Sequence, residues 1–138
     1  MSHTLFVRES PARSARPRLR RPISDAQIER EFRAACAKAG ISDPTIRVYP
    51  PLTEEHRRNP RRYAQCIPHE HLFEIAEQYR YLPWRYRLGL MAHEIGHVID
   101  PDPEKTEDAA DFWGGRALGI KIVYDHRWPG KGLQMAKL

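Results

Sequence analysis

The sequence predicts an α+β domain in which a small sheet of about three short strands packs on three main helices. Residues 25–39, 85–99 and 104–118 place apolar side chains at helical spacing. Short alternating or β-branched segments lie between these helices. Hydrophobic residues make up 41% of the 138-residue chain and charged residues 30%, which is typical of a globular protein with one modest core.

The N-terminal segment 1–22 is predicted to be a basic, disordered arm, and the folded domain to span 23–138. Arginine, proline and serine dominate this arm, and the chain has a formal net charge of +5. Clusters of arginine attract phosphate groups without reading base sequence. Because no nucleic-acid-binding motif accompanies the charge, the sequence favours a solvated arm, with binding to nucleic acid as the alternative.

The first predicted helix, 25–39, has a signal at each end. Ser24 is a typical N-cap, and Gln27 follows three residues later in the arrangement of a capping box. Gly40 is a typical stop. Residues 45–49 then alternate and are rich in β-branched side chains, which predicts a strand that two prolines end.

Further strands are less sharply defined by the sequence. Residues 63–67 fit a second short strand. For residues 69–81 the spacing of apolar side chains suits a helix, but a strand over 71–76 suits the same stretch, so both alternatives stay open. Residues 120–124 predict a strand after the last helix, and the proline and glycines in 125–138 predict an irregular end.

The central predicted helix carries the main functional signal of the chain, the pentapeptide His93-Glu94-Ile95-Gly96-His97. Residues i and i+4 share one face of a helix, so both imidazoles can reach one ion. Zn²⁺ accepts imidazole nitrogen well, and Glu94 is placed to activate a zinc-bound water. This H-E-x-x-H signature of zinc peptidases predicts one Zn²⁺ per chain.

A catalytic zinc site usually has three protein ligands and a water, so a third ligand is needed. The downstream candidates are Asp100, Asp102, Glu104, Glu107, Asp108, Asp111 and His126. If the last two helices pack antiparallel, His97 and Glu107 lie at the same height, about 4.5 Å of helix rise from the connecting loop. One turn further from the loop, His93 faces Asp111. Glu107 is therefore predicted as the third ligand and Asp111 as the acceptor that orients His93. A shift of one residue in the loop would favour Asp108.

Peptide hydrolysis also needs a hydrogen-bond donor, besides the metal, for the oxyanion that forms. The candidates are His126, Tyr124, Tyr81 and Tyr86. His126 is favoured as a second catalytic residue because it follows the strand after the last helix. Gly96 and Gly114 would allow the last two helices to approach closely beneath the metal.

These residues carry a resemblance to a known family. His93-Glu94-x-x-His97 followed by Glu107-x-x-x-Asp111 resembles the H-E-x-x-H plus E-x-x-x-D pattern of gluzincin-type zinc metallopeptidases. The His-Glu-Ile-Gly-His pentapeptide and the chain length are also similar to small peptidases of the ImmA/IrrE kind, found in bacteria and on mobile elements, which cut regulatory proteins. The interval of ten residues from His97 to Glu107 is short for the gluzincin pattern.

The resemblance implies a mini-zincin fold in which helix 85–99 faces helix 104–118. It implies these roles: zinc ligands His93, His97 and Glu107, general base and acid Glu94, and Asp111 as the partner of His93. The predicted function is zinc-dependent hydrolysis of peptide bonds in a protein or peptide. The alternative is a non-proteolytic zinc protein with a structural or regulatory site, whose basic arm binds nucleic acid or a protein partner. A zinc hydrolase acting on RNA is a third interpretation.

Location and membrane association follow from composition. No apolar run is long enough to span a bilayer, so no membrane partner is expected. Two cysteines, Cys36 and Cys66, are too few for the disulfide framework of a small secreted protein. The N-terminus lacks the apolar segment of a secretory signal. We therefore expect a cytoplasmic location with reduced thiols.

Overall fold

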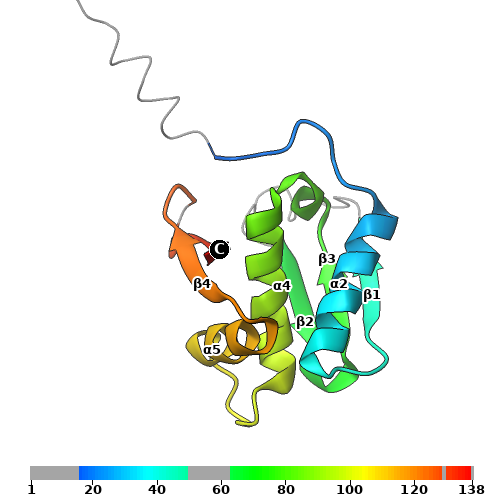
Figure 1. The fold of residues 1–138 in the computed structure, drawn as a ribbon, viewed down its shortest axis with the longest axis vertical. Coiled ribbons are helices and arrows are strands. Elements are labelled where there is room, and N and C mark those ends of the chain that lie inside the picture. Colours follow the sequence, from blue (N-terminus) through cyan, green and yellow to red (C-terminus); the bar gives the residue numbers. More distant parts are fainter. Residues whose placement is uncertain (1–15, 50–62, 129, 138) are drawn as a thin grey trace, which may run out of the picture.

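The computed structural model describes residues 16–49, 63–128 and 130–137, and it is an α+β structure, as the sequence predicts (Figure 1). Its helices and strands are, in chain order, α2 (Asp25–Ala39), β1 (Thr45–Val48), β2 (Ala64–Ile67), the 3₁₀ helix η1 (Pro68–Glu70), β3 (Leu72–Ile75), the 3₁₀ helix η2 (Glu77–Tyr81), α4 (Trp84–Ile99), α5 (Glu107–Leu118), β4 (Lys121–Asp125) and β5 (Leu133–Lys137).

The strands form two small sheets rather than the single sheet that was predicted. The first has the order β1-β3-β2, with β1 parallel and β2 antiparallel to β3. The second is the antiparallel pair β4-β5. The prediction of an irregular end over 125–138 is wrong, because β5 lies there. Its sequence, Leu-Gln-Met-Ala-Lys, has no β-branched residue, so pairing with β4 and packing on α4 determine the strand rather than propensity.

The ambiguous stretch 69–81 contains a strand and no α-helix. Leu72–Ile75 forms β3, the central strand of the first sheet, and 3₁₀ helices lie on either side of it. Phe73 and Ile75 are fully buried. Because β3 pairs with strands on both edges, hydrogen bonds to β1 and β2 override the helical spacing of its apolar residues.

Helix α2 has the predicted bounds and the predicted caps. The Ser24 side chain accepts a hydrogen bond from the backbone N–H of Gln27 at 3.1 Å. Gly40 ends the helix in the left-handed conformation, with φ of 81°. Phe32, on the buried face, packs against Phe73 with ring centroids 5.5 Å apart. The helix therefore covers the first sheet through an aromatic contact.

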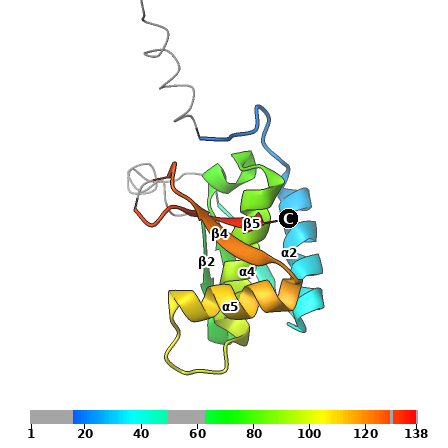
Figure 2. The ribbon, with the colours of Figure 1, turned by 60° about the vertical axis from the view of Figure 1, so that its left-hand side comes forward.

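Helix α4 is the centre of the molecule (Figures 1 and 2). It contacts α2, α5, β2 and the second sheet, and its residues are buried on every side through most of its length. One buried charge, Arg87, is paired with Glu31 of α2 through two hydrogen bonds of 3.0 Å. No helix in the described ranges combines the length and apolar character needed to cross a membrane.

Helix α5 begins at Glu107, three residues later than predicted. Thr106 is its N-cap, and the Thr106 hydroxyl accepts from the backbone N–H of Ala109 at 3.1 Å. The helix crosses α4 steeply instead of running antiparallel along it (Figure 2). At the crossing the backbones touch: a Cβ added at Gly114 would lie 1.6 Å from the carbonyl oxygen of Ala92, and one at Gly96 would lie 1.8 Å from that of Ala110.

The described part of the N-terminal arm lies against the domain, where the sequence predicted disorder. The backbone N–H of Leu19 donates to the carbonyl of Tyr81 at 2.7 Å. The Arg16 side chain donates to the carbonyl of Arg127 at 3.3 Å. Residues 1–15, and the arginine-rich stretch within 50–62, lie outside the described residues.

The helix crossing predicts a large effect of a single methyl group. An exposed helical Gly→Ala change normally stabilises a helix, by up to about 1 kcal/mol. At Gly114 the added Cβ has no room, so we expect G114A to lower the free energy of unfolding by about 1–3 kcal/mol. R116A, at an exposed site of the same helix, should change it by no more than about 0.5 kcal/mol. Urea unfolding measures both; an unchanged stability of G114A contradicts the backbone contact.

Candidate metal centre

Three side chains that the sequence assigned to the metal come together at the crossing of α4 and α5. The Nε2 atom of His97 lies 2.6 Å from Oε2 of Glu107, and Nε2 of His93 lies 3.4 Å from the same oxygen. The centroids of the two imidazole rings lie 4.7 Å apart, and the ring planes are nearly perpendicular. One ligand atom from each residue lies within 4.8 Å of the other two, so this group could hold a metal ion.

Local sequence explains the placement of each ligand. His93 and His97 are one turn apart on α4, so their rings emerge on one face. Glu107 is the first residue of α5, directly after the Thr106 cap, and a carboxylate is favoured at a helix N-terminus. The Glu107 side chain is 63% exposed, whereas His93 is almost fully buried. The ligand group therefore opens toward solvent on the Glu107 side.

Asp111 lies one turn further along α5, and its side chain contacts His93. Its Oδ1 atom is 2.7 Å from Nδ1 of His93. A carboxylate on Nδ1 fixes the tautomer that leaves Nε2 without a proton and available to a metal. The other oxygen, Oδ2, accepts a hydrogen bond from the hydroxyl of Tyr124 in β4. Burial and this hydrogen bond raise the pKa of Tyr124 above its usual range, so the phenol keeps the proton that it donates.

The two imidazoles differ in their pKa directions. Burial lowers the pKa of His97, and the neighbouring His93 lowers it further, so His97 is neutral and able to ligate at neutral pH. Burial also lowers the pKa of His93, but the hydrogen bond to Asp111 and the nearby carboxylates outweigh that effect and raise it overall. A proton therefore competes with a metal at His93 as the pH falls.

Glu94 lies beside the ligands in a buried position. It is only 7% exposed, and burial raises the pKa of its carboxyl to about 7. The Cys66 thiol of β2 approaches the Glu94 carbonyl oxygen at 3.5 Å. Burial, followed by the charge of Glu94, raises the pKa of the Cys66 thiol. No pattern in the sequence indicates that β2 lies against this turn of α4.

Two other residues that the sequence made candidates, for the third ligand and for the oxyanion donor, lie outside the group of potential ligands. Asp108 is exposed on α5 and does not belong to the metal-binding group. His126 is exposed in the turn after β4, and no hydrogen bond within the described ranges joins it to the ligands. Its neighbour Asp125 is held by Tyr86, which lies seven residues, about 10 Å of helix rise, before His93 on α4. The structure thus gives His126 no contact with the site.

Tyr124 was considered for the oxyanion, but its hydroxyl is directed to Asp111. A tyrosine in a strand after α5 is visible in the sequence, whereas its pairing with Asp111 depends on the path of β4.

No protein-family model matches this chain, and the searches of curated proteins and of solved structures found no match either.

The first test of this centre is metal-dependent stability. Zn²⁺ at about 100 times its Kd should raise the free energy of unfolding of chelator-treated protein by about 2.7 kcal/mol, because the metal binds only the folded chain. H93A should show no such rise. H69A removes an exposed histidine outside the group and should respond as wild type does. Denaturant unfolding with and without Zn²⁺ measures the difference, and an equal rise in H93A excludes this ligand set.

The second test separates neighbouring acids on α5. D111N removes the charge that orients His93 and should weaken metal binding by about 10- to 100-fold. D108N makes the same chemical change on an exposed residue and should leave the metal Kd within about twofold. Competition with a chromophoric chelator gives both values. Equal Kd values for the two variants would show that Asp111 does not orient a ligand.

Proposed function

We propose that this protein is a zinc-dependent hydrolase of peptide bonds, similar in its site to gluzincin-type metallopeptidases. The observation that carries the proposal is the convergence of His93, His97 and Glu107 from two helices, with Asp111 behind His93. Two imidazoles and one carboxylate suit Zn²⁺. The Nε2 atoms of His93 and His97 lie 3.4 and 2.6 Å from the same Glu107 oxygen, so these three residues would hold the ion together.

The number of ligands favours catalysis over a structural role. A structural zinc site is closed by four protein ligands, whereas a catalytic site has three and leaves one position open. In the described part of the chain, the group of potential ligands contains three residues. Its Glu107 side is exposed. A site of this form supports access by water and a substrate, and thus favours an enzyme over the non-proteolytic alternative.

Glu94 would move the protons of the reaction. Zn²⁺ held by the three ligands supplies a Lewis acid, which polarises a carbonyl and acidifies water. Glu94 is next to His93 on α4 and buried beside the ligands, where it would accept a proton from the attacking water. It would then return that proton to the leaving amine. A carboxyl whose pKa burial raises to about 7 is suited to both steps near neutral pH.

The neighbouring sheet favours a peptide as the substrate. In the described ranges β2 is an edge strand of the first sheet. It lies against the same turn of α4, since Cys66 of β2 contacts the Glu94 carbonyl. An extended peptide can add to a sheet edge through backbone hydrogen bonds. Such pairing would place a peptide bond beside Glu94, whereas RNA has no comparable way to use a strand edge.

A glutamine substitution tests the proposal. E94Q keeps the size of the side chain and the three metal ligands but removes the proton acceptor. We expect E94Q to bind zinc as wild type does and to lose at least about 100-fold in the rate of peptide cleavage. Zinc-loaded proteins are incubated with a proteome-derived peptide mixture, and new termini are identified by mass spectrometry.

The matched control is E104Q, which alters an exposed glutamate in the loop before α5. It should cleave the same peptides as wild type at a similar rate. New termini made equally by E94Q and wild type would show that Glu94 is not the base. Zinc-loaded wild type that makes no new termini would favour the non-proteolytic alternative.

A further inference from the structure

Strand β4 is attached to helices α4 and α5 by consecutive residues. The Tyr124 hydroxyl donates to Asp111 on α5, and Asp125 accepts from the Tyr86 hydroxyl on α4. Successive side chains of a strand point to opposite faces, so one strand can serve both helices. The two contacts are chemically alike, since each joins a tyrosine hydroxyl to an aspartate. They differ in their position, because only the Tyr124 contact reaches Asp111, which is itself bonded to the potential ligand His93.

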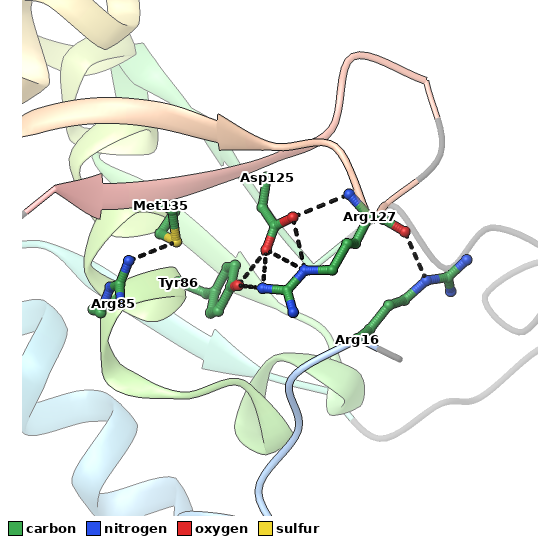
Figure 3. A network of polar contacts seen from close by, with 6 residues as sticks. All are labelled: Arg16, Arg85, Tyr86, Asp125, Arg127 and Met135. Carbon is green, nitrogen blue, oxygen red and sulfur yellow. Dashed lines mark hydrogen bonds and ion pairs between the residues drawn. The ribbon is translucent and has the colours of Figure 1, made fainter. Parts of the chain in front are cut away.

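The Asp125 end of β4 is held by a network that does not involve the ligands (Figure 3). The guanidinium of Arg127 donates to Asp125 Oδ2 at 2.6 Å and to the Tyr86 hydroxyl at 3.0 Å. The backbone N–H of Arg127 donates to Oδ1 of Asp125 at 3.0 Å. This network attaches the end of β4 to α4 and contains no residue of the His93, His97 and Glu107 group.

The Asp111 carboxylate is held at both of its oxygens. Oδ1 faces Nδ1 of His93 at 2.7 Å, and Oδ2 accepts from Tyr124. A carboxylate bonded at one oxygen can turn about its Cβ–Cγ bond and change the direction of the remaining hydrogen bond. The second contact prevents this rotation. Because Nδ1 and Nε2 belong to one rigid ring, a fixed Asp111 also fixes the direction of the Nε2 lone pair.

We propose that Tyr124 is a positioning residue of the metal centre: its hydroxyl holds Asp111 in the orientation that presents His93 to the metal. This inference rests on the proposed function, because it concerns the metal which that function needs. It adds a third residue to the chain of contacts behind the ligand, namely Tyr124 to Asp111 to His93. The tyrosine is not one of the three potential ligands, and its hydroxyl bonds Asp111.

A merely structural role of the hydroxyl makes a different prediction. A hydrogen bond that only attaches β4 to α5 would, when removed, lower stability and leave the affinity of the folded protein for metal unchanged. A positioning role lowers the affinity as well. The two roles also differ when Asp111 is altered, because a residue that acts through Asp111 has no separate effect once that carboxylate is lost.

The experiment compares Y124F with Y86F. Each variant loses one tyrosine hydroxyl that donates to an aspartate, and each keeps the aromatic ring. For Y124F we expect the Kd for Zn²⁺ to rise about tenfold, at the lower end of the effect of losing an outer partner of a ligand. Y86F should stay within about twofold of wild type. Chelator competition gives the Kd, and circular dichroism verifies that each apoprotein is folded.

Two further readouts make the test independent of activity. The visible spectrum of the Co²⁺-substituted protein reports ligand geometry and should change in Y124F but not in Y86F. The double variant D111N/Y124F should bind Zn²⁺ no more weakly than D111N alone. If the two losses multiply instead, the tyrosine does not act through Asp111 and the inference is wrong.

The outcomes separate this inference from the proposed function. Wild type that binds Zn²⁺ and cleaves peptides, with Y124F equal to it in Kd and Co²⁺ spectrum, overturns the positioning role alone. Wild type that binds no Zn²⁺ overturns both. A higher Kd in Y124F, together with a non-multiplicative double variant, supports the positioning role whether or not a peptide is cleaved.

Discussion

The close backbone contact between α4 and α5 is the constraint on which the rest of this structure depends. Gly96 and Gly114 leave no Cβ at the crossing, so the helix axes approach until carbonyl groups touch the opposite backbone. At a wider spacing, Glu107 would not reach the imidazoles, because a glutamate side chain extends only a few ångströms beyond its helix. Steep crossings with small residues at the contact allow this approach over a short length. The ligand group lies directly beside that contact and therefore depends on two residues that have no side chain.

A buried central helix that carries polar groups needs a partner for each of them. Arg87 is paired with Glu31 from α2, and His93 with Asp111 from α5. An unpaired buried ionisable group is costly, so each pair also fixes the position of the neighbouring helix. Glu94 differs from both, because burial raises its pKa to about 7 in spite of the neighbouring His93 and Cys66. A buried carboxyl of this kind, next to a group of potential ligands, is typical of a functional site rather than of a structural ion pair.

Local signals in the sequence predicted α2 to the residue, because Ser24 and Gly40 act through contacts within a few positions. The grouping of His93, His97 and Glu107 was also predictable, because each pair of acidic or histidine side chains shares one helix face close to the loop that joins α4 and α5. The sequence did not predict the crossing angle, the start of α5 at Glu107 or the strand β5, and it left β3 as one of two alternatives. These features depend on pairing with distant segments, which periodicity does not encode. The partner of Asp111 in β4 escaped prediction for the same reason.

The two-sided attachment of β4 links the hairpin to the metal centre in one further way. Side chains alternate along a strand, so a slip of one residue would exchange the faces of Tyr124 and Asp125. Both contacts would be lost together, and an acidic side chain would be turned toward Asp111. A one-residue insertion or deletion between residues 121 and 125 would therefore break both contacts. The residue two positions after Asp125 is tied to the same end of the strand, because Arg127 donates to Asp125.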